Sequence, residues 1–165
     1  MDVSAPAAPV EERYGDEQAP LRSYAAFMTA YNVAFAGALL TARMLGREIP
    51  RLSAGDVMLF GVATHKLSRL LAKDKVTAAL RTPFAEYEDE GGPAEVEERP
   101  RGQGPRRAVG ELITCPYCLD QWVAAGFTVA SIFAPRATRL TASVFATVAL
   151  ADFLQIGYKA GQEAV

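Results

Sequence analysis

The two cysteines are the residues best suited to chemistry. Cys115 and Cys118 are the only cysteines in a chain of 165 residues, and Pro116 and Tyr117 separate them. Proline favours the first position of a helix, so we expect Thr114 or Cys115 to cap a helix that begins at Pro116. The backbone N–H groups and the dipole of that helix would stabilise a thiolate at Cys115.

Three interpretations of this CxxC pair are open. Disulfide exchange needs water-accessible sulfur atoms, whereas the segment after the pair is strongly apolar. Zinc or iron–sulfur binding needs more ligands, which the single histidine, His65, or a second copy of the chain in a homodimer could supply. The third interpretation is that reduced cysteines pack at a helix start. We favour packing and predict no cofactor, and the alternative is a zinc or iron–sulfur site at Cys115, Cys118 and His65.

Charged residues inside apolar segments form a second candidate site. At 1.5 Å per helical residue, Arg69 lies about 24 Å along its helix and Asp152 about 20 Å along its own. Asp120 lies about one turn after the expected helix start at Pro116. Charges in apolar surroundings are costly unless they are paired. We therefore predict that Arg69 meets Asp120 or Asp152 beside the cysteines.

Four long apolar segments must position these residues. Each has roughly the 20 residues that a helix needs to cross the hydrocarbon layer of a membrane. The sequence therefore predicts an all-α fold, an integral membrane bundle of four transmembrane helices. The predicted spans cover about residues 23–43, 53–73, 116–134 and 139–158.

Polar segments flank this predicted membrane domain, which covers residues 22–165. Residues 1–21 are acidic and rich in proline and alanine, so we expect a flexible tail. Residues 74–82 have an amphipathic pattern and are expected to lie on the cytoplasmic membrane surface. Residues 85–107 change from acidic to basic and contain glycine and proline, which predicts a mobile cytoplasmic linker.

The overall charge argues against nucleic-acid binding. The chain has 17 Lys and Arg against 19 Asp and Glu, so it carries no basic field. The distribution of Lys and Arg favours a cytoplasmic position for both termini and the linker, because basic residues are enriched on that side of the spans.

Two stretches resemble a known family. They are residues 65–84, which include His65-Lys66-Leu67-Ser68-Arg69-Leu70 and Leu80-Arg81-Thr82-Pro83-Phe84, and residues 110–123, from Gly110-Glu111-Leu112-Ile113 to Trp122-Val123. Together they resemble the bacterial membrane family catalogued as domain of unknown function thirteen-sixty, which includes a sporulation-associated protein. The resemblance covers about residues 53–158, and it implies a small bacterial integral membrane protein without indicating a reaction. With the four predicted spans, we expect a multi-pass protein of the bacterial plasma membrane. The motif cluster comprises Arg69, Asp74, Arg81, Pro83, Phe84, Glu111, Cys115, Cys118 and Trp122, to which the charge argument adds Asp120 and Asp152.

The function that we favour from sequence is non-enzymatic. We expect an accessory or structural subunit that contacts membrane lipids and binds a membrane or cytoplasmic protein through its cytoplasmic face, with homo-oligomerisation as a further option. One alternative is a thiol-redox or metal-binding membrane protein that uses Cys115 and Cys118. The other is a small transport or signalling component that uses an intramembrane Arg/Asp cluster.

Overall fold

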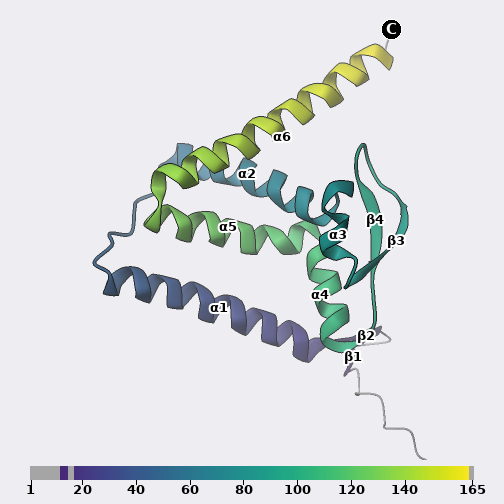
Figure 1. Cartoon of the computed structure of the whole chain (residues 1–165), viewed down its shortest axis with the longest axis horizontal. Helices are drawn as coiled ribbons and strands as arrows, with labels where there is room; N and C mark the ends of the chain where they lie inside the picture. The colour runs from purple at the N-terminus through teal and green to yellow at the C-terminus, as the bar shows by residue number, and fades with distance from the viewer. Residues whose placement is uncertain (1–11, 15–16, 164–165) are drawn as a thin grey trace, which may run out of the picture.

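The computed structural model describes residues 12–14 and 17–163, which form helices and two small antiparallel sheets (Figure 1). Most of the expected flexible tail, residues 1–11 and 15–16, lies outside the described part. The helices are α1 (Leu21–Met44), α2 (Ala54–Ala72), the 3-10 helix η1 (Lys75–Thr77), α3 (Ala78–Arg81), α4 (Gly104–Thr114), α5 (Pro116–Phe133) and α6 (Pro135–Glu163). The strands are β1 (Glu12–Tyr14), β2 (Glu17–Ala19), β3 (Ala85–Glu90) and β4 (Val96–Pro100).

Helix α2 is the centre of the helical body. It packs against α6 on one side and α5 on the other, and α1 lies along the far side of α5 (Figure 1). The core consists of Phe60 and Ala63 of α2, Phe127 of α5 and Ala142 of α6. The rings of Phe60 and Phe127 stack with their centroids 5.7 Å apart. The buried core is therefore small and depends mainly on contacts of α2.

Local capping signals set two of the helix starts, and the start at Pro116 is the one predicted from sequence. Ser53 accepts a hydrogen bond from the backbone N–H of Asp56, and the Asp56 carboxylate accepts one from the Ser53 N–H, which completes a capping box. Cys115 caps α5 by accepting from the N–H of Cys118, with Pro116 at the first helical position. Both starts depend on residues within one helical turn.

The prediction of an all-α bundle with four transmembrane helices is wrong. Of the described helices, α1 and α6 are the two that are long and apolar enough to span a membrane. Lys66 and Arg69 make the second half of α2 charged, and Asp120 and Gln121 make the start of α5 polar. The sequence prediction considered length and gave these polar residues too little weight.

The prediction of a mobile linker over residues 85–107 is also wrong. Strands β3 and β4 form an antiparallel hairpin in which Ala85 pairs with Pro100 and Glu90 with Val96, and α4 follows. The preceding amphipathic stretch is helical in part, as η1 and α3. These elements lie together at one end of the helical body (Figure 1), and we call η1, α3, β3, β4 and α4 the head.

Candidate functional site

The hairpin is joined to the end of α2 by backbone hydrogen bonds. The N–H of Val96 donates to the Lys73 carbonyl at 2.9 Å, and the N–H of Lys75 donates to the Ala94 carbonyl at 2.9 Å. Ala85 of β3 and Val96 of β4 are buried. These backbone hydrogen bonds fix the hairpin to the end of α2. The polar side chains of the hairpin therefore have a defined position.

Ion pairs reinforce this junction. Arg69 donates from Nε to Glu95 Oε1 at 3.0 Å and from Nη2 to Glu95 Oε2 at 2.5 Å, a two-pronged pair. Lys73 Nζ lies 2.6 Å from Glu97 Oε2. The basic end of α2 is therefore paired with Glu95, just before β4, and with Glu97 of β4. The predicted pairing of Arg69 with Asp120 or Asp152 is wrong, since Glu95 occupies its guanidinium.

Arg81 is the most deeply buried charged residue of the head. Its side chain is 2% exposed, and it is paired with Glu98, which is 6% exposed. The guanidinium also donates to the carbonyls of Leu71 at 2.7 Å and Asp74 at 3.0 Å. A buried charge is tolerated only when its hydrogen bonds are satisfied, and here one side chain ties α2, η1 and β4 together.

Pro83 and Phe84 attach α4 to the rest of the head. The Pro83 carbonyl accepts from Arg106 Nε at 3.0 Å and from Nη2 at 2.7 Å, and the Phe84 carbonyl accepts from the Arg101 N–H at 2.8 Å. Gly110 of α4 lies so close that a Cβ there would be 2.4 Å from the Phe84 oxygen. The motif residues of this stretch therefore act as positioning groups for α4.

Asp74 contributes to the head mainly through its backbone. Its carbonyl accepts from Arg81 and from Thr77 Oγ1, at 3.0 Å in both cases. Partial burial raises the pKa of its carboxyl, and the nearby Lys66 ammonium offsets only part of this effect. The motif aspartate thus has a structural role, as a backbone acceptor for Arg81 and Thr77.

The cysteines lie where α4 meets α5. Their Sγ atoms are 2.7 Å apart, so the pair is close enough to share a proton, a metal ion or a bond after a small movement. Loss of hydration and the adjacent Cys115 sulfur raise the pKa of the Cys118 thiol to about 12. Cys118 is therefore protonated at neutral pH, and a stabilised thiolate at Cys115 stays a prediction.

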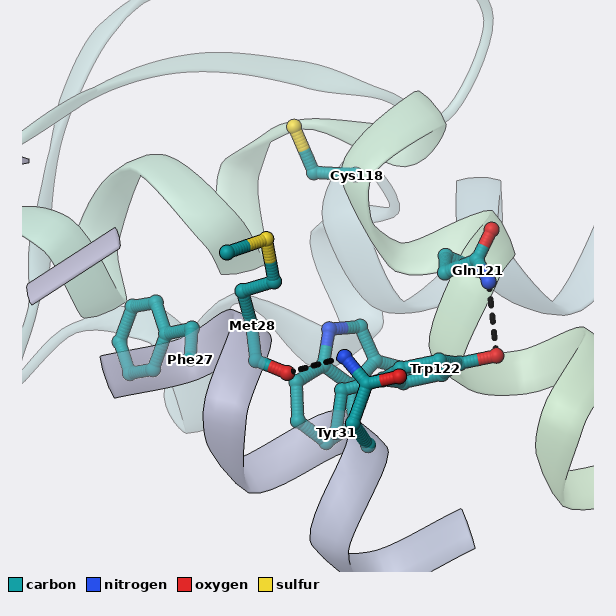
Figure 2. A pocket seen from close by; sticks show the side chains of 7 residues that line it. Phe27, Met28, Tyr31, Cys118, Gln121 and Trp122 are labelled. Atoms are coloured by element: carbon teal, nitrogen blue, oxygen red, sulfur yellow. Dashed lines mark hydrogen bonds between the residues drawn. The ribbon is translucent and has the colours of Figure 1, made fainter. Parts of the chain in front are cut away.

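A cavity of about 380 Å³ lies between α1 and the first turns of α5, and Cys118 forms part of its wall (Figure 2). Gln121 Nε2 donates to the Tyr31 hydroxyl at 2.7 Å across this cavity, and the rings of Tyr31 and Trp122 meet edge to face with centroids 5.4 Å apart. Near the start of α1, the Tyr24 hydroxyl donates to one carboxylate oxygen of Glu111, and the other oxygen accepts from Arg107. Glu111 and Trp122 thus fix α1 against α4 and α5.

Other predicted site residues are dispersed. Asp152 of α6 pairs with Lys66 of α2 at 2.8 Å, and His65 stacks on Phe153 of α6 with ring centroids 6.1 Å apart. Among the side chains that the structure describes, those of residues 19–163, no group of three His, Cys, Asp or Glu could hold a metal ion. A single-chain metal site that combines His65 with the cysteines is therefore not formed. Asp120 faces a different cavity, between α2 and α5.

Sequence reasoning missed the acidic partners Glu95, Glu97 and Glu98. All three lie in the stretch that was expected to be mobile. A hairpin signal was present, because Gly91-Gly92-Pro93 separates two runs that contain Tyr87 and Val96. The charge switch alone could not show which basic residue each glutamate would meet.

Comparisons with known proteins place these features in a family. Residues 59–158 match a family described as "Protein of unknown function (DUF1360)". The chain is also 29% identical over 102 residues to a protein of Bacillus subtilis named "Sporulation protein YjcA", and the alignment covers 60% of this chain and 86% of that protein. No solved structure is significantly similar. The matched region contains the head, both cysteines and most of α2, α5 and α6, so the chain belongs to the DUF1360 family.

Proposed function

We propose that the protein is a small, non-enzymatic accessory subunit of the bacterial plasma membrane, anchored by α1 and α6, which presents its head to a protein partner. One observation carries the membrane part. In the most apolar 18-residue windows of α1 and α6, only 6% and 11% of the residues are buried, so both helices leave their apolar side chains uncovered. A water-soluble protein rarely exposes apolar surface on this scale.

The lengths of the two helices suit a bilayer. With 24 residues in α1 and 29 in α6, they reach about 36 Å and 43 Å at 1.5 Å per residue, enough for a hydrocarbon layer of about 30 Å. Because α1 starts and α6 ends on the head side (Figure 1), we place both termini and the head together in the cytoplasm. The many Lys and Arg residues of the head favour that orientation.

Exposed apolar residues on the head suggest where a partner binds. Val76 of η1 is 81% exposed and Leu80 of α3 is 69% exposed, and they are four positions apart in a helical segment. Neighbours at this spacing lie on one face. We call Val76 and Leu80 the head patch. The relative's name refers to sporulation and to no reaction, which agrees with an accessory role.

Membrane anchoring is tested by washing bacterial membranes at high pH with sodium carbonate. We expect the full-length chain to stay in the pellet and to dissolve only in detergent. Release of most of the chain by carbonate, with the head still resistant to protease, would contradict anchoring. Reporter fusions at the two termini then test whether both lie in the cytoplasm.

Partner binding is tested separately by purification in mild detergent. Replacing Val76 and Leu80 by serine should remove a co-purified protein while leaving the chain folded, because both side chains are exposed. The matched control is Leu45→Ser, which changes a residue 64% exposed just after α1. Loss of the partner in both variants, or in neither, would argue against the head patch.

A second candidate function is a dithiol site, favoured by the 2.7 Å separation of the two sulfur atoms. Here the pair would be oxidised by a small disulfide, with the two thiol protons and two electrons passing to the oxidant, or would bind a metal with the pair of a second copy. Mass spectrometry of protein isolated under thiol-blocking conditions distinguishes these states. Two blocked thiols and no metal would exclude both.

A further inference from the structure

Arginines gather at the end of the helical body that lies opposite the head. Helix α1 ends at this end, and α2 and α6 begin there (Figure 1). Five arginines belong to these segments, and we call them the arginine rim: Arg43 of α1, Arg47 and Arg51 of the loop between α1 and α2, and Arg136 and Arg139 of α6. Within residues 43–56 and 134–139 the acidic residues are Glu48 and Asp56. This end of the molecule is therefore positively charged.

Four arginines of the rim have no partner in the protein. Arg139 pairs with the Asp56 carboxylate. Among the side chains that the structure describes, those of residues 19–163, no ion pair or hydrogen bond is made by the other four, Arg43, Arg47, Arg51 and Arg136. All four are exposed. Their charge is therefore available to a group outside the chain.

Helix stability does not explain three of these four arginines. Arg43 lies in the last turn of α1, where a cation interacts favourably with the helix dipole. Arg136 is the second residue of α6, near the positive end of that dipole, where a cation is unfavourable. Arg47 and Arg51 lie outside the helices. The charge at this end thus needs a reason other than local structure.

Exposed apolar side chains alternate with the arginines. Met44 is 88% exposed, Leu45 64% and Ile49 61%, and Leu140 on the first turns of α6 is 70% exposed. At a membrane surface, apolar side chains of this kind enter the acyl region while basic groups stay among the headgroups. A soluble anion would neutralise the arginines and leave the apolar side chains in water. The pattern therefore favours a lipid over a soluble ligand.

The charge of the rim also selects between lipids. The phosphate of phosphatidylcholine is accompanied by an ammonium group, which the unpaired arginines repel. The phosphate of phosphatidylglycerol has no such group, so that lipid brings a net negative charge to the rim. A guanidinium donates strong hydrogen bonds to phosphate oxygens. An anionic phospholipid therefore fits the rim better than a zwitterionic one.

We propose that the arginine rim binds the phosphate groups of anionic phospholipids, whose acyl chains cover Met44, Leu45 and Ile49. This inference rests on the membrane anchoring by α1 and α6 proposed above. It is independent of the head patch and of the two cysteines.

The test follows the fluorescence anisotropy of phosphatidylglycerol, labelled on an acyl chain, as it binds the full-length chain in mild detergent. We expect saturable binding, with unlabelled phosphatidylglycerol competing at least about tenfold better than phosphatidylcholine. The double variant Arg47→Gln, Arg51→Gln should weaken binding at least about tenfold, since each basic residue near anionic headgroups contributes about fivefold. Equal competition by the two lipids would overturn the proposal.

The matched control is the double variant Lys75→Gln, Arg99→Gln. It removes the same two charges from exposed side chains of the head, which are 55% and 63% exposed, and it should leave the affinity unchanged. The variant Arg47→Lys, Arg51→Lys keeps the charge and should bind nearly as well as the original chain. If the control weakens binding as much as the glutamine variant, or if the lysine variant binds as weakly, the proposal is overturned.

Two further outcomes would assign the rim to another ligand. Glycerol 3-phosphate in large excess should not displace the labelled lipid, and displacement would indicate a soluble phosphate ligand and overturn the proposal. A protein that co-purifies with the original chain and is lost from the Arg47→Gln, Arg51→Gln variant, with lipid binding unchanged, would overturn it as well.

Carbonate extraction separates this inference from the anchoring on which it rests. If the chain stays in the membrane pellet but shows no preference for phosphatidylglycerol, the arginine rim is refuted and the anchoring is retained. If carbonate releases the chain, both are refuted. We expect the original chain and the Arg47→Gln, Arg51→Gln variant to stay in the pellet, because α1 and α6 are unchanged.

Discussion

The head buries a charged side chain, whereas the two outer helices, α1 and α6, expose apolar side chains. In the head, a charged residue is buried: Arg81 is 1% exposed and paired with Glu98. In the outer helices, apolar residues are uncovered: Val33 of α1 is 67% exposed and Leu154 of α6 is 66% exposed. The head pairs its buried charge internally, whereas α1 and the outer face of α6 leave apolar side chains uncovered.

This contrast shows which contacts define each region. The head is specified by pairs between residues far apart in sequence, such as Arg69 with Glu95 and Arg81 with Glu98. Helix α1 is specified by composition and length and contacts the body at a few points, such as Tyr31 with Gln121, whereas α6 packs along α2 and places Ala142 in the core. Substitutions should therefore have opposite consequences in the two regions.

Arg81→Ala should give the largest effect. It removes the Arg81 donor from the Glu98 carboxylate and from the Leu71 carbonyl, and removing one partner of a buried pair costs about 3–5 kcal/mol. Thermal unfolding of the protein in detergent measures the loss. Arg99→Ala is the control, because Arg99 is 63% exposed where it pairs with Glu86, and such pairs contribute about 0–1 kcal/mol. Equal losses would remove the distinction between buried and surface charge in the head.

Val33→Lys is the corresponding change in α1. If α1 is in lipid, a lysine near its middle costs about 2.5–3.5 kcal/mol, and the fraction of the chain that resists carbonate extraction should fall. Val76→Lys in the head is the control, with a valine that is 81% exposed. If Val33→Lys lowers the carbonate-resistant fraction no more than Val76→Lys does, α1 faces water. The contrast between the head and the outer helices would then be wrong.

Gly110→Ala tests the close packing inside the head. The added Cβ would meet the Phe84 oxygen at 2.4 Å and Pro100 Cβ at 2.9 Å, and such overpacking costs about 1–3 kcal/mol. Gly37→Ala in α1 should instead be neutral or slightly stabilising, because nothing lies within 4 Å of its Cβ. Circular dichroism melts of both variants check the sign of each effect. A destabilised Gly37→Ala protein would mean that α1 is packed more tightly than α4.

Tyr31→Phe should give the smallest effect. It removes the hydroxyl that accepts from Gln121 at 2.7 Å, and a hydrogen bond of this kind contributes about 1 kcal/mol. Tyr158→Phe is the matched control on α6, since the Tyr158 hydroxyl accepts from Gln162 at 3.3 Å and its residue is 71% exposed. Hydrogen exchange along α1 should increase in the first variant only. An unchanged α1 would show that the Tyr31 and Trp122 rings alone hold it.

Features that depend on neighbours in sequence could be predicted, and features that depend on distant partners could not. The helix start at Pro116 follows from residues within one turn, and the structure confirms it. The capping box at Ser53 is equally local. The partner of Arg69 is 26 positions away, in the turn just before β4, and the pairing of the hairpin sets its position. Helix arithmetic placed Asp120 beside Arg69, but it could not show that Asp120 lines a cavity between α2 and α5.

The attachment of α1 has a consequence for how the molecule can be divided. The family match begins at residue 59, inside α2, and the core of Phe60, Ala63, Phe127 and Ala142 includes no residue of α1. Its links to the body are concentrated at Tyr24 and Tyr31, in the first half of the helix. Helix α1 can therefore be removed without removing a core residue. A chain shortened to begin at Arg47 would keep the core of α2, α5 and α6, and the cavity beside Trp122 would lose the wall that α1 provides.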